Sequence, residues 1–333
     1  MNYRTILFLL TIVFTNIVFA QEFTIKFATL APDGSTWMNV MKEFDAAIRK
    51  ESKGRIGFKM YAGGVQGDEK DVLRKVKLGQ LHSAGITGVG IGDIAKQVRI
   101  LDAPFLFKTY DEVDAVRTKF SSTFTKAFDD GGYILLGFAE VGFVYTYTNT
   151  IVRAPSDLQH VKMWMWEGDP IAEAMFNAMN ISPIPLSITD VMTSLQTKLI
   201  DGVYASPLAA IALQWFTRTK YMLEVPLADA QGAVVIAKKM YDKMPADMQE
   251  ILTRNGKLYM EKLTKLSRED NAKSIETLKK NGVQIISLSD KKQLDGYDEI
   301  GKKARRLLVG KLYDETLLTE IEKSVAALRT SRK

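Results

Sequence analysis

Strands and helices alternate over the first hundred residues of this 333-residue chain, and no other feature of the sequence constrains its fold as strongly. Residues 23–28 alternate apolar with polar or small side chains, as in a strand, and apolar residues recur at helical spacing over 37–48. A strand over 57–61, a helix over 68–78 and a strand over 82–87 follow. This order predicts an α/β protein whose mostly parallel sheet is covered by helices.

Two later segments predict a second lobe. Residues 133–148 form an extended β-rich segment, and residues 232–238 contain another apolar strand. Strands at these places can cross between domains, so we expect two α/β lobes with hinge strands, each lobe built from separate stretches of chain. Long helical patterns fill 245–280 and 291–329 near the C-terminus. The predicted division is 21–140 with 233–280 in lobe I, and 141–232 with 281–333 in lobe II.

The first twenty residues have the pattern of an export signal. Arg4 precedes an apolar run over 6–14, and residues 18–20 supply the small side chains that signal peptidase requires, so cleavage after Ala20 is expected. A transmembrane anchor would need about twenty apolar residues, whereas Thr15 interrupts this run. We therefore expect an exported mature chain.

Composition argues against several kinds of chemistry. The chain has no Cys and two His, at 82 and 160, which argues against disulfides, thiolate catalysis, metal cages and histidine triads. Lys and Arg exceed Asp and Glu by 45 to 39, a weak signal for nucleic acid, and the basic stretch 302–306 is followed by leucines typical of an amphipathic helix. We expect no cofactor, no metal site, no nucleic-acid partner and no enzymatic activity.

Short motifs in a fixed order carry a resemblance to a known family. Together they resemble the extracytoplasmic substrate-binding proteins of TRAP transporters, the DctP-like family, over essentially the whole mature chain. The motifs are residues 25–28, 52–56, 61–64, 67–69, 79–82, 101–107, 153–158 with Lys162, and 195–197 with 201–202.

The resemblance implies a periplasmic-binding-protein-like fold and a receptor that delivers small organic anions to the integral-membrane subunits of a TRAP transporter. In this family, an arginine that ends a Lys-x-Arg strand makes a bidentate pair with a substrate carboxylate. The present sequence departs from that pattern. Aligning Lys162 with the family lysine puts Trp164 at the arginine position, and residues 163–166 contain no cation.

This replacement predicts an apolar or amphipathic ligand, because an indole cannot neutralise a carboxylate in a closed cleft. By strand alternation, Trp164 and Trp166 face one side and Met163 and Met165 the other, so one of these pairs can equally be core. Thr87 and Asp33 can equally be helix caps. The candidate ligand-binding residues are Trp164, Trp166, Tyr204, Ser206, Thr87, Tyr145 and Asp33.

Three functions remain open. The leading hypothesis is a periplasmic TRAP receptor for a partly hydrophobic solute. We also place the chain, as a hypothesis, in the branch of the family that works with a tetratricopeptide-repeat partner protein and is known for less polar sites. The alternatives are a receptor for C4-dicarboxylate-like organic acids that uses another cation, and a carrier of lipid-like cargo independent of any TRAP transporter.

Overall fold

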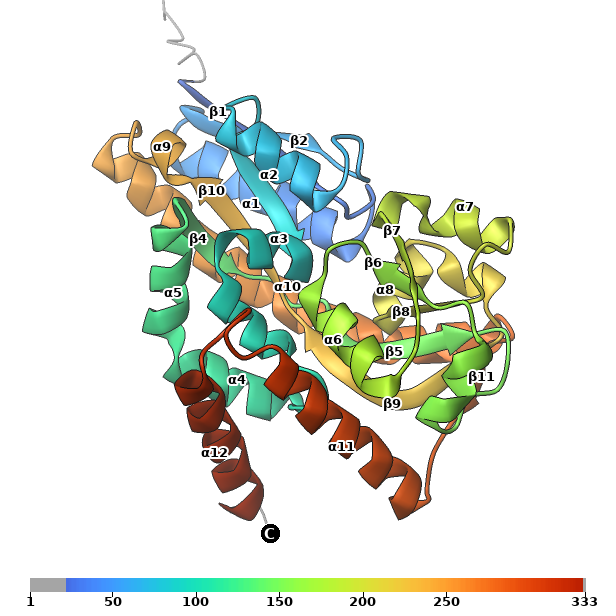
Figure 1. Cartoon of the computed structure of the whole chain (residues 1–333). Coiled ribbons are helices and arrows are strands. Elements are labelled where there is room, and N and C mark those ends of the chain that lie inside the picture. The colour runs from blue at the N-terminus through green and yellow to red at the C-terminus, as the bar shows by residue number, and fades with distance from the viewer. Residues whose placement is uncertain (1–21, 332–333) are drawn as a thin grey trace, which may run out of the picture.

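The computed structural model describes residues 22–331, in which two separate sheets form the centres of two lobes (Figure 1). The lobe I strands are β1 (Phe23–Thr29), β2 (Ile56–Tyr61), β3 (Ser83–Thr87), β4 (Tyr133–Phe138) and β10 (Gly232–Ala237). They lie in the order β2-β1-β3-β10-β4, with β1 parallel to β2 and β3, and β10 antiparallel to β3 and β4. Because β10 lies between two much earlier strands, lobe I is discontinuous in sequence, as predicted. The predicted export signal lies outside the described residues.

Helices cover both faces of the lobe I sheet. Successive side chains point to opposite faces, and the central strands β3 and β10 are buried at almost every position. On one face, Ser35 caps α1 (Thr36–Glu51), and Phe44 of this helix packs in a cluster with Leu252 of α10 (Ala246–Lys280). The opposite face packs against a second cluster formed by shorter helices. These are α2 (Glu69–Lys77), α3 (Gly88–Ile94), η1 (Lys96–Asp102), α4 (Tyr110–Lys119) and α5 (Ser121–Asp130).

Lobe II contains a four-stranded sheet and a separate strand pair. The larger sheet has the order β11-β9-β5-β8, with β5 (Gly142–Thr148), β8 (Gly202–Ala205), β9 (Tyr221–Ala230) and β11 (Gln284–Ile286). The pair is formed by β6 (Trp164–Trp166) and β7 (Ile184–Leu186), which run parallel. The remaining elements of this region are η2 (Pro155–His160), α6 (Pro170–Met179), η3 (Ile188–Asp190), α7 (Val191–Gln196), α8 (Pro207–Ala212) and η4 (Trp215–Arg218).

The chain crosses between the lobes at the two predicted places. Residues 139–141 connect β4 of lobe I to β5 of lobe II, and Gln231 connects β9 to β10. The 35-residue helix α10 contacts α1 and β4 of lobe I and also α8 and β5 of lobe II, so it runs alongside both lobes. Short α9 (Lys238–Tyr241) joins β10 to this helix.

Two local features differ from the sequence-based expectation. The ten-residue strand β9 was not predicted, and its Glu224, Pro226 and alternating polar residues explain the weak apolar signal. The strand expected from the alternation over residues 163–166 is reduced to β6, since η2 and a turn occupy the residues before it.

The glycines at 88–92 form α3 and have a packing role. A Cβ on Gly90 would lie 2.8 Å from the Ile86 side chain and 2.9 Å from the Glu69 carboxylate. Glycine is therefore required for the close approach of α3 to its neighbours.

The predicted lobe boundaries remain a proposal, and the C-terminal helices fit them unequally. Helix α11 (Lys291–Leu307) packs on α6 of lobe II, whereas α12 (Glu315–Ser331) contacts α4 of lobe I. Both helices are amphipathic, and amphipathicity alone does not specify which lobe covers the apolar face.

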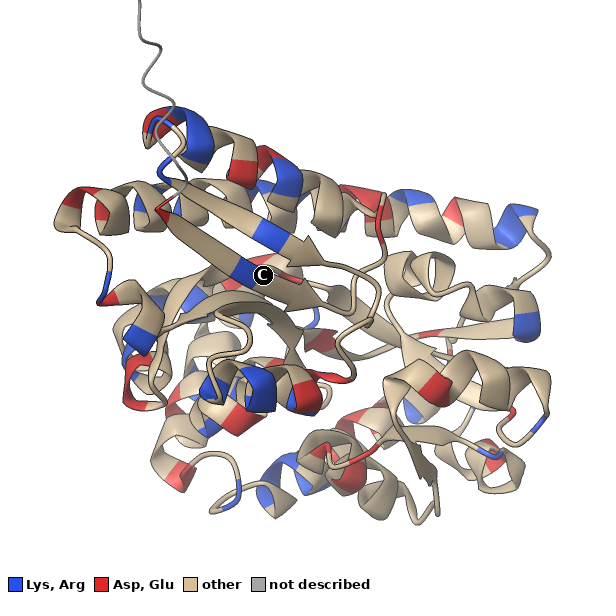
Figure 2. Cartoon of the chain, turned by 90° about the horizontal axis from the view of Figure 1, so that it is seen from above, with Lys and Arg blue, Asp and Glu red and all other residues tan. Residues whose placement is uncertain are grey.

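The surface carries charges of both signs. Figure 2 shows Lys and Arg interspersed with Asp and Glu over the helices in that view. Within residues 22–331, no helix is both long enough and apolar enough to cross a membrane.

Candidate functional site

A cavity of about 460 Å³ is lined by residues of both lobes. Lobe I contributes the β1–α1 loop and the end of β3, while lobe II contributes β6, α6, β8 and α8. A volume of this size is typical of sites for small organic molecules, which occur preferentially where two domains meet.

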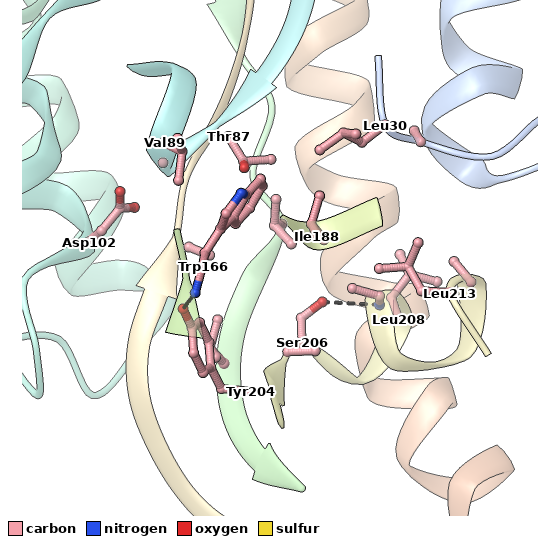
Figure 3. A pocket seen from close by; sticks show the side chains of 18 of the residues that line it. Leu30, Thr87, Val89, Asp102, Trp166, Ile188, Tyr204, Ser206, Leu208 and Leu213 are labelled. Carbon is pink, nitrogen blue, oxygen red and sulfur yellow. Dashed lines mark hydrogen bonds between the residues drawn. The ribbon is translucent and has the colours of Figure 1, made fainter. Parts of the chain in front are cut away.

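One side of the cavity is apolar. Leu208 and Leu213, at α8 and its end, lie there with Leu30 of the β1–α1 loop and Ile188 of η3. In Figure 3 the α8 leucines lie on the side opposite Asp102, with Trp166 between them in that view. The cavity is therefore apolar toward α8 and charged toward η1.

Trp164 lines the cavity but is almost entirely enclosed by lobe II. Its side chain is 1% exposed, and its Nε1 donates a hydrogen bond to Leu186 O at 3.0 Å. The indole stacks on Tyr204 with ring centroids 4.8 Å apart and meets the ring of Trp215 edge-on at 5.2 Å. Trp164 thus forms part of the cavity wall and of the lobe II core together.

Trp166 is more accessible and connects the two lobes. Its Nε1 donates to Asp68 Oδ2 of lobe I at 3.1 Å, and its backbone N–H donates to the Tyr204 hydroxyl at 3.0 Å (Figure 3). Because Trp166 belongs to β6 and Tyr204 to β8, the hydrogen bond to the Tyr204 hydroxyl connects these two strands.

Asp68 receives further hydrogen bonds from lobe II. Its Oδ2 also accepts from Ser187 Oγ at 2.6 Å and from Ile188 N at 3.3 Å, while Oδ1 caps α2 through Glu69 N at 2.6 Å. The sequence identified Asp68 as part of a family motif and gave no sign of this role, since its partners are about one hundred residues away.

The two hydroxyl candidates line the cavity with their polar atoms already engaged. Thr87 Oγ1 donates to Glu69 Oε1 at 2.8 Å, and Ser206 Oγ accepts from Ala209 N at 3.2 Å as the cap of α8. Thr87 precedes α3 but makes no side-chain capping bond to it.

The other two candidates do not line the cavity. Asp33 is exposed and pairs with Lys42 at 2.6 Å, which lowers the pKa of its carboxyl. Tyr145 packs, partly buried, between hydrophobic clusters of the two lobes. For both residues, a direct ligand contact remains a prediction without support from the cavity.

Arg99 is the charged residue that sequence analysis missed. Its side chain is 3% exposed; Nε donates to Asp102 Oδ2 at 2.6 Å and Nη2 to Asp169 Oδ1 at 2.9 Å. All three residues line the cavity, and Arg99 is the one cation among the described lining residues. Asp102 also accepts from Gln231 N at 2.7 Å, so this cluster links lobe I, the hinge and the α6 N-terminus of lobe II.

Burial shifts the titration of two cavity carboxyls. The pKa of Glu69 is raised to about 7 by burial, against hydrogen bonds from Gly90 N and from Thr87. Burial likewise raises the pKa of Asp102 to about 6, although the adjacent Arg99 guanidinium lowers it. Across residues 22–331, no group of three or more His, Cys, Asp or Glu is arranged to hold a metal ion.

These features define a class of protein. Two α/β lobes connected by paired crossing strands, with a cavity between them, are the architecture of a receptor that closes around a small solute. Residues 27–305 match the family model described as bacterial extracellular solute-binding protein, family 7 (DctP), and the chain belongs to this family.

Individual relatives are distant. The chain is 24% identical over 272 residues to the 2,3-diketo-L-gulonate-binding periplasmic protein YiaO of Escherichia coli K12, covering 80% of this chain and 81% of that one. It is 23% identical to the C4-dicarboxylate-binding periplasmic protein DctP of Rhodobacter capsulatus, covering 79% of each.

Solved structures share the fold. A TRAP periplasmic solute-binding protein from Pseudomonas putida F1 with bound D-glucuronate has a TM-score of 0.80 and 24% identity, covering 90% of this chain and 97% of that one. One from Ralstonia eutropha H16 with bound (S)-2-acetolactate has a TM-score of 0.84 at 18% identity, covering 91% and 99%.

Proposed function

We propose that this protein is the periplasmic receptor of a TRAP transporter and that its solute is a small amphipathic molecule held mainly by apolar contacts. The relatives described above are named for, or contain, hydrophilic organic acids. Membership of the family supports the transport role, and the residues that line the cavity of this chain support the kind of solute.

The division of the cavity into an apolar and a charged side supports this proposal most directly. Leu208 and Leu213 lie on one side and Asp102 on the other, so an elongated molecule can place its apolar part toward α8 and its polar part toward η1 (Figure 3). Each methylene group removed from water contributes about 0.8 kcal/mol to binding.

The position of the family arginine supports the same conclusion. Trp164 occupies it, and its single donor is used by Leu186 O. No cation from β6 is therefore available for a carboxylate.

A second candidate function is a receptor for organic acids, with Arg99 as the cation. The observation that favours it is Arg99 Nη1, a buried nitrogen without a hydrogen-bond partner among the described residues. An acid oxygen that reached this nitrogen would satisfy it.

Calorimetric titration separates the two functions. We expect octanamide to bind and D-glucuronate and succinate to bind at least about tenfold more weakly, because burying an uncompensated charge is costly. Tighter binding of either acid than of octanamide would reject the amphipathic solute and support the second candidate.

A matched pair of substitutions locates the apolar contact. Leu208→Asn places a polar group at the α8 side of the cavity and should weaken octanamide binding at least about tenfold. Leu258→Asn makes the same change on the exposed surface of α10, where the leucine is 59% exposed, and should leave the affinity unchanged. Equal effects of the two substitutions would argue against binding in this cavity.

The partners are proposed from the family and remain to be tested. TRAP integral-membrane subunits should accept the solute from this receptor, and a tetratricopeptide-repeat protein is a further proposed partner. Uptake by vesicles containing the membrane subunits, dependent on added receptor, would support transport; binding without any such uptake would favour an independent carrier of lipid-like cargo.

A further inference from the structure

The charged side of the cavity contains more carboxyl groups than cations. Glu69, Asp102 and Asp169 line it together with Arg99, the one cation in the described lining. Glu69 and Asp102 belong to lobe I and Asp169 to the start of α6 in lobe II.

Two of the three guanidinium nitrogens of Arg99 already donate hydrogen bonds to carboxylates. Nε and Nη2 donate to Asp102 and Asp169, so two carboxylates accompany one cation. An incoming anion would therefore meet a group of net negative charge. Like charges disfavour each other strongly where water is excluded.

The nitrogen left over, Nη1, lies beside α3. A Cβ added to Gly92 would lie 3.3 Å from Nη1, and Gly92 is not among the residues that line the cavity. Nε and Nη2 lie instead near Gly88, which does line the cavity. A Cβ added to Gly88 would lie 2.8 Å from Nη2. The unpartnered donor thus lies near a residue that does not line the cavity, while Nε and Nη2 are engaged by carboxylates that do.

An acceptor remains at the cavity. Asp169 Oδ1 accepts from both Arg99 Nη2 and Ile171 N, whereas Oδ2 accepts no hydrogen bond within the described part of the chain. Asp169 is 8% exposed and lines the cavity. A carboxylate oxygen in this state, on a side chain that lines the cavity, is a suitable partner for a hydrogen-bond donor of a ligand.

We propose that the polar end of the solute is a hydrogen-bond donor without negative charge, an amide, hydroxyl or ammonium group, and that Asp169 binds it. This inference rests on the proposed amphipathic solute and deepens it by naming the head group. The cavity would accordingly reject the carboxylates that relatives are named for, because two acids already surround its arginine.

A series of probes with a common eight-carbon chain tests the proposal. Octanamide, octylammonium and octanoate are titrated into the protein without its expected signal, residues 21–333, by calorimetry at neutral pH. We expect octanamide and octylammonium each to bind at least about tenfold more tightly than octanoate. Octanoate binding as tightly as either of them would overturn the inference.

The series also separates this inference from the proposed function. If octanoate binds best while D-glucuronate binds weakly, the amphipathic solute stands and the head-group inference fails. If D-glucuronate binds more tightly than every octyl probe, or no octyl probe binds, both fail.

The substitution Asp169→Asn assigns the effect to one carboxylate. Asparagine caps helices about as well as aspartate, so α6 keeps its first hydrogen bond while the cluster loses one negative charge. The affinity ratio of octanamide to octanoate should fall at least about tenfold. An unchanged ratio would overturn the assignment, and the wild-type probe series remains decisive if the variant does not fold.

The control is the same substitution at a remote site. Asp130 lies exposed on α5 and pairs with Lys126. Asp130→Asn removes an equal charge and should leave the affinity ratio unchanged; a ratio that falls as far as in Asp169→Asn would contradict a local effect of Asp169.

Discussion

Under the proposed function, the aromatic wall of lobe II and the charged cluster beside the hinge would both disfavour anions, but in different ways. In the wall, Trp164, which the motif comparison aligns with the family arginine, packs against Tyr204 and Trp215. In the cluster, a cation is present, but Asp102 and Asp169 compensate the charge of Arg99. If the proposed function holds, a cavity can lose its preference for acids either by removal of a cation or by carboxylates that surround one.

The largest expected effect comes from the aromatic wall. Trp164→Ala should lower the free energy of unfolding by about 4 kcal/mol, because it leaves a cavity in the lobe II core and removes one of the two hydrogen bonds that the Leu186 carbonyl accepts. Urea unfolding measures this change. The near-complete burial of Trp164 is the basis of this prediction.

Trp166 provides a matched control two residues along the same strand. Its indole is more accessible and bonds across the lobes to Asp68, so Trp166→Ala should destabilise the chain clearly less than Trp164→Ala. Equal losses for the two tryptophans would contradict the assignment of Trp164 to the core.

The charged cluster gives the next effect. Arg99→Leu should lower the free energy of unfolding by about 3 kcal/mol, since it leaves Asp102 and Asp169 buried without their cation. Arg74→Leu, at the exposed pair with Asp71, should stay within about 1 kcal/mol of wild type in the same urea assay. A stability loss at Arg99 no larger than that at Arg74 would contradict the compensated cluster.

A smaller effect concerns pH. The folded-state pKa of Glu69 is raised from 4.5 to about 7, so folding takes up a proton between these values. Its contribution to stability is therefore greatest below about pH 4.5 and is lost as pH rises toward 7, with a slope of at most about 1.4 kcal/mol per pH unit.

The difference between wild type and Glu69→Gln isolates this contribution from the other carboxyls. The variant should show a weaker fall in stability from pH 4.5 to 7, while Glu173→Gln, exposed on α6, should follow wild type. Parallel pH profiles for wild type and Glu69→Gln would contradict the raised pKa.

The smallest effect tests how the lobes are held together. Asp68→Asn weakens the acceptor shared by Trp166, Ser187 and Ile188 and should shift the balance toward open lobes by about 1 kcal/mol. Distances between spin labels on the two lobes would report a larger open fraction. Asp71→Asn, exposed on the same helix, should leave the distances unchanged, and an unaltered distribution in Asp68→Asn would argue against this contact.

Local patterns predicted the fold well because each strand and helix has its own periodicity. The crossings at 139–141 and Gln231 followed from extended segments whose partners are far apart in sequence. The lobe contacted by α12 could not be predicted, because its apolar stripe fits either lobe.

The site was only partly predictable. Trp164, Trp166, Tyr204, Ser206 and Thr87 all line the cavity, because the family motifs mark the strand ends that meet there. Arg99 and Asp169 were not predicted because they lie 70 residues apart in the sequence, so no local pattern indicates that they form an ion pair.

The most direct test of the proposed function is native mass spectrometry of the protein isolated from its native cells without refolding. We expect a bound molecule that is amphipathic and carries no net negative charge. A bound hexuronate, C4-dicarboxylate or other small organic acid would contradict the central claim that this cavity has lost the preference for anions.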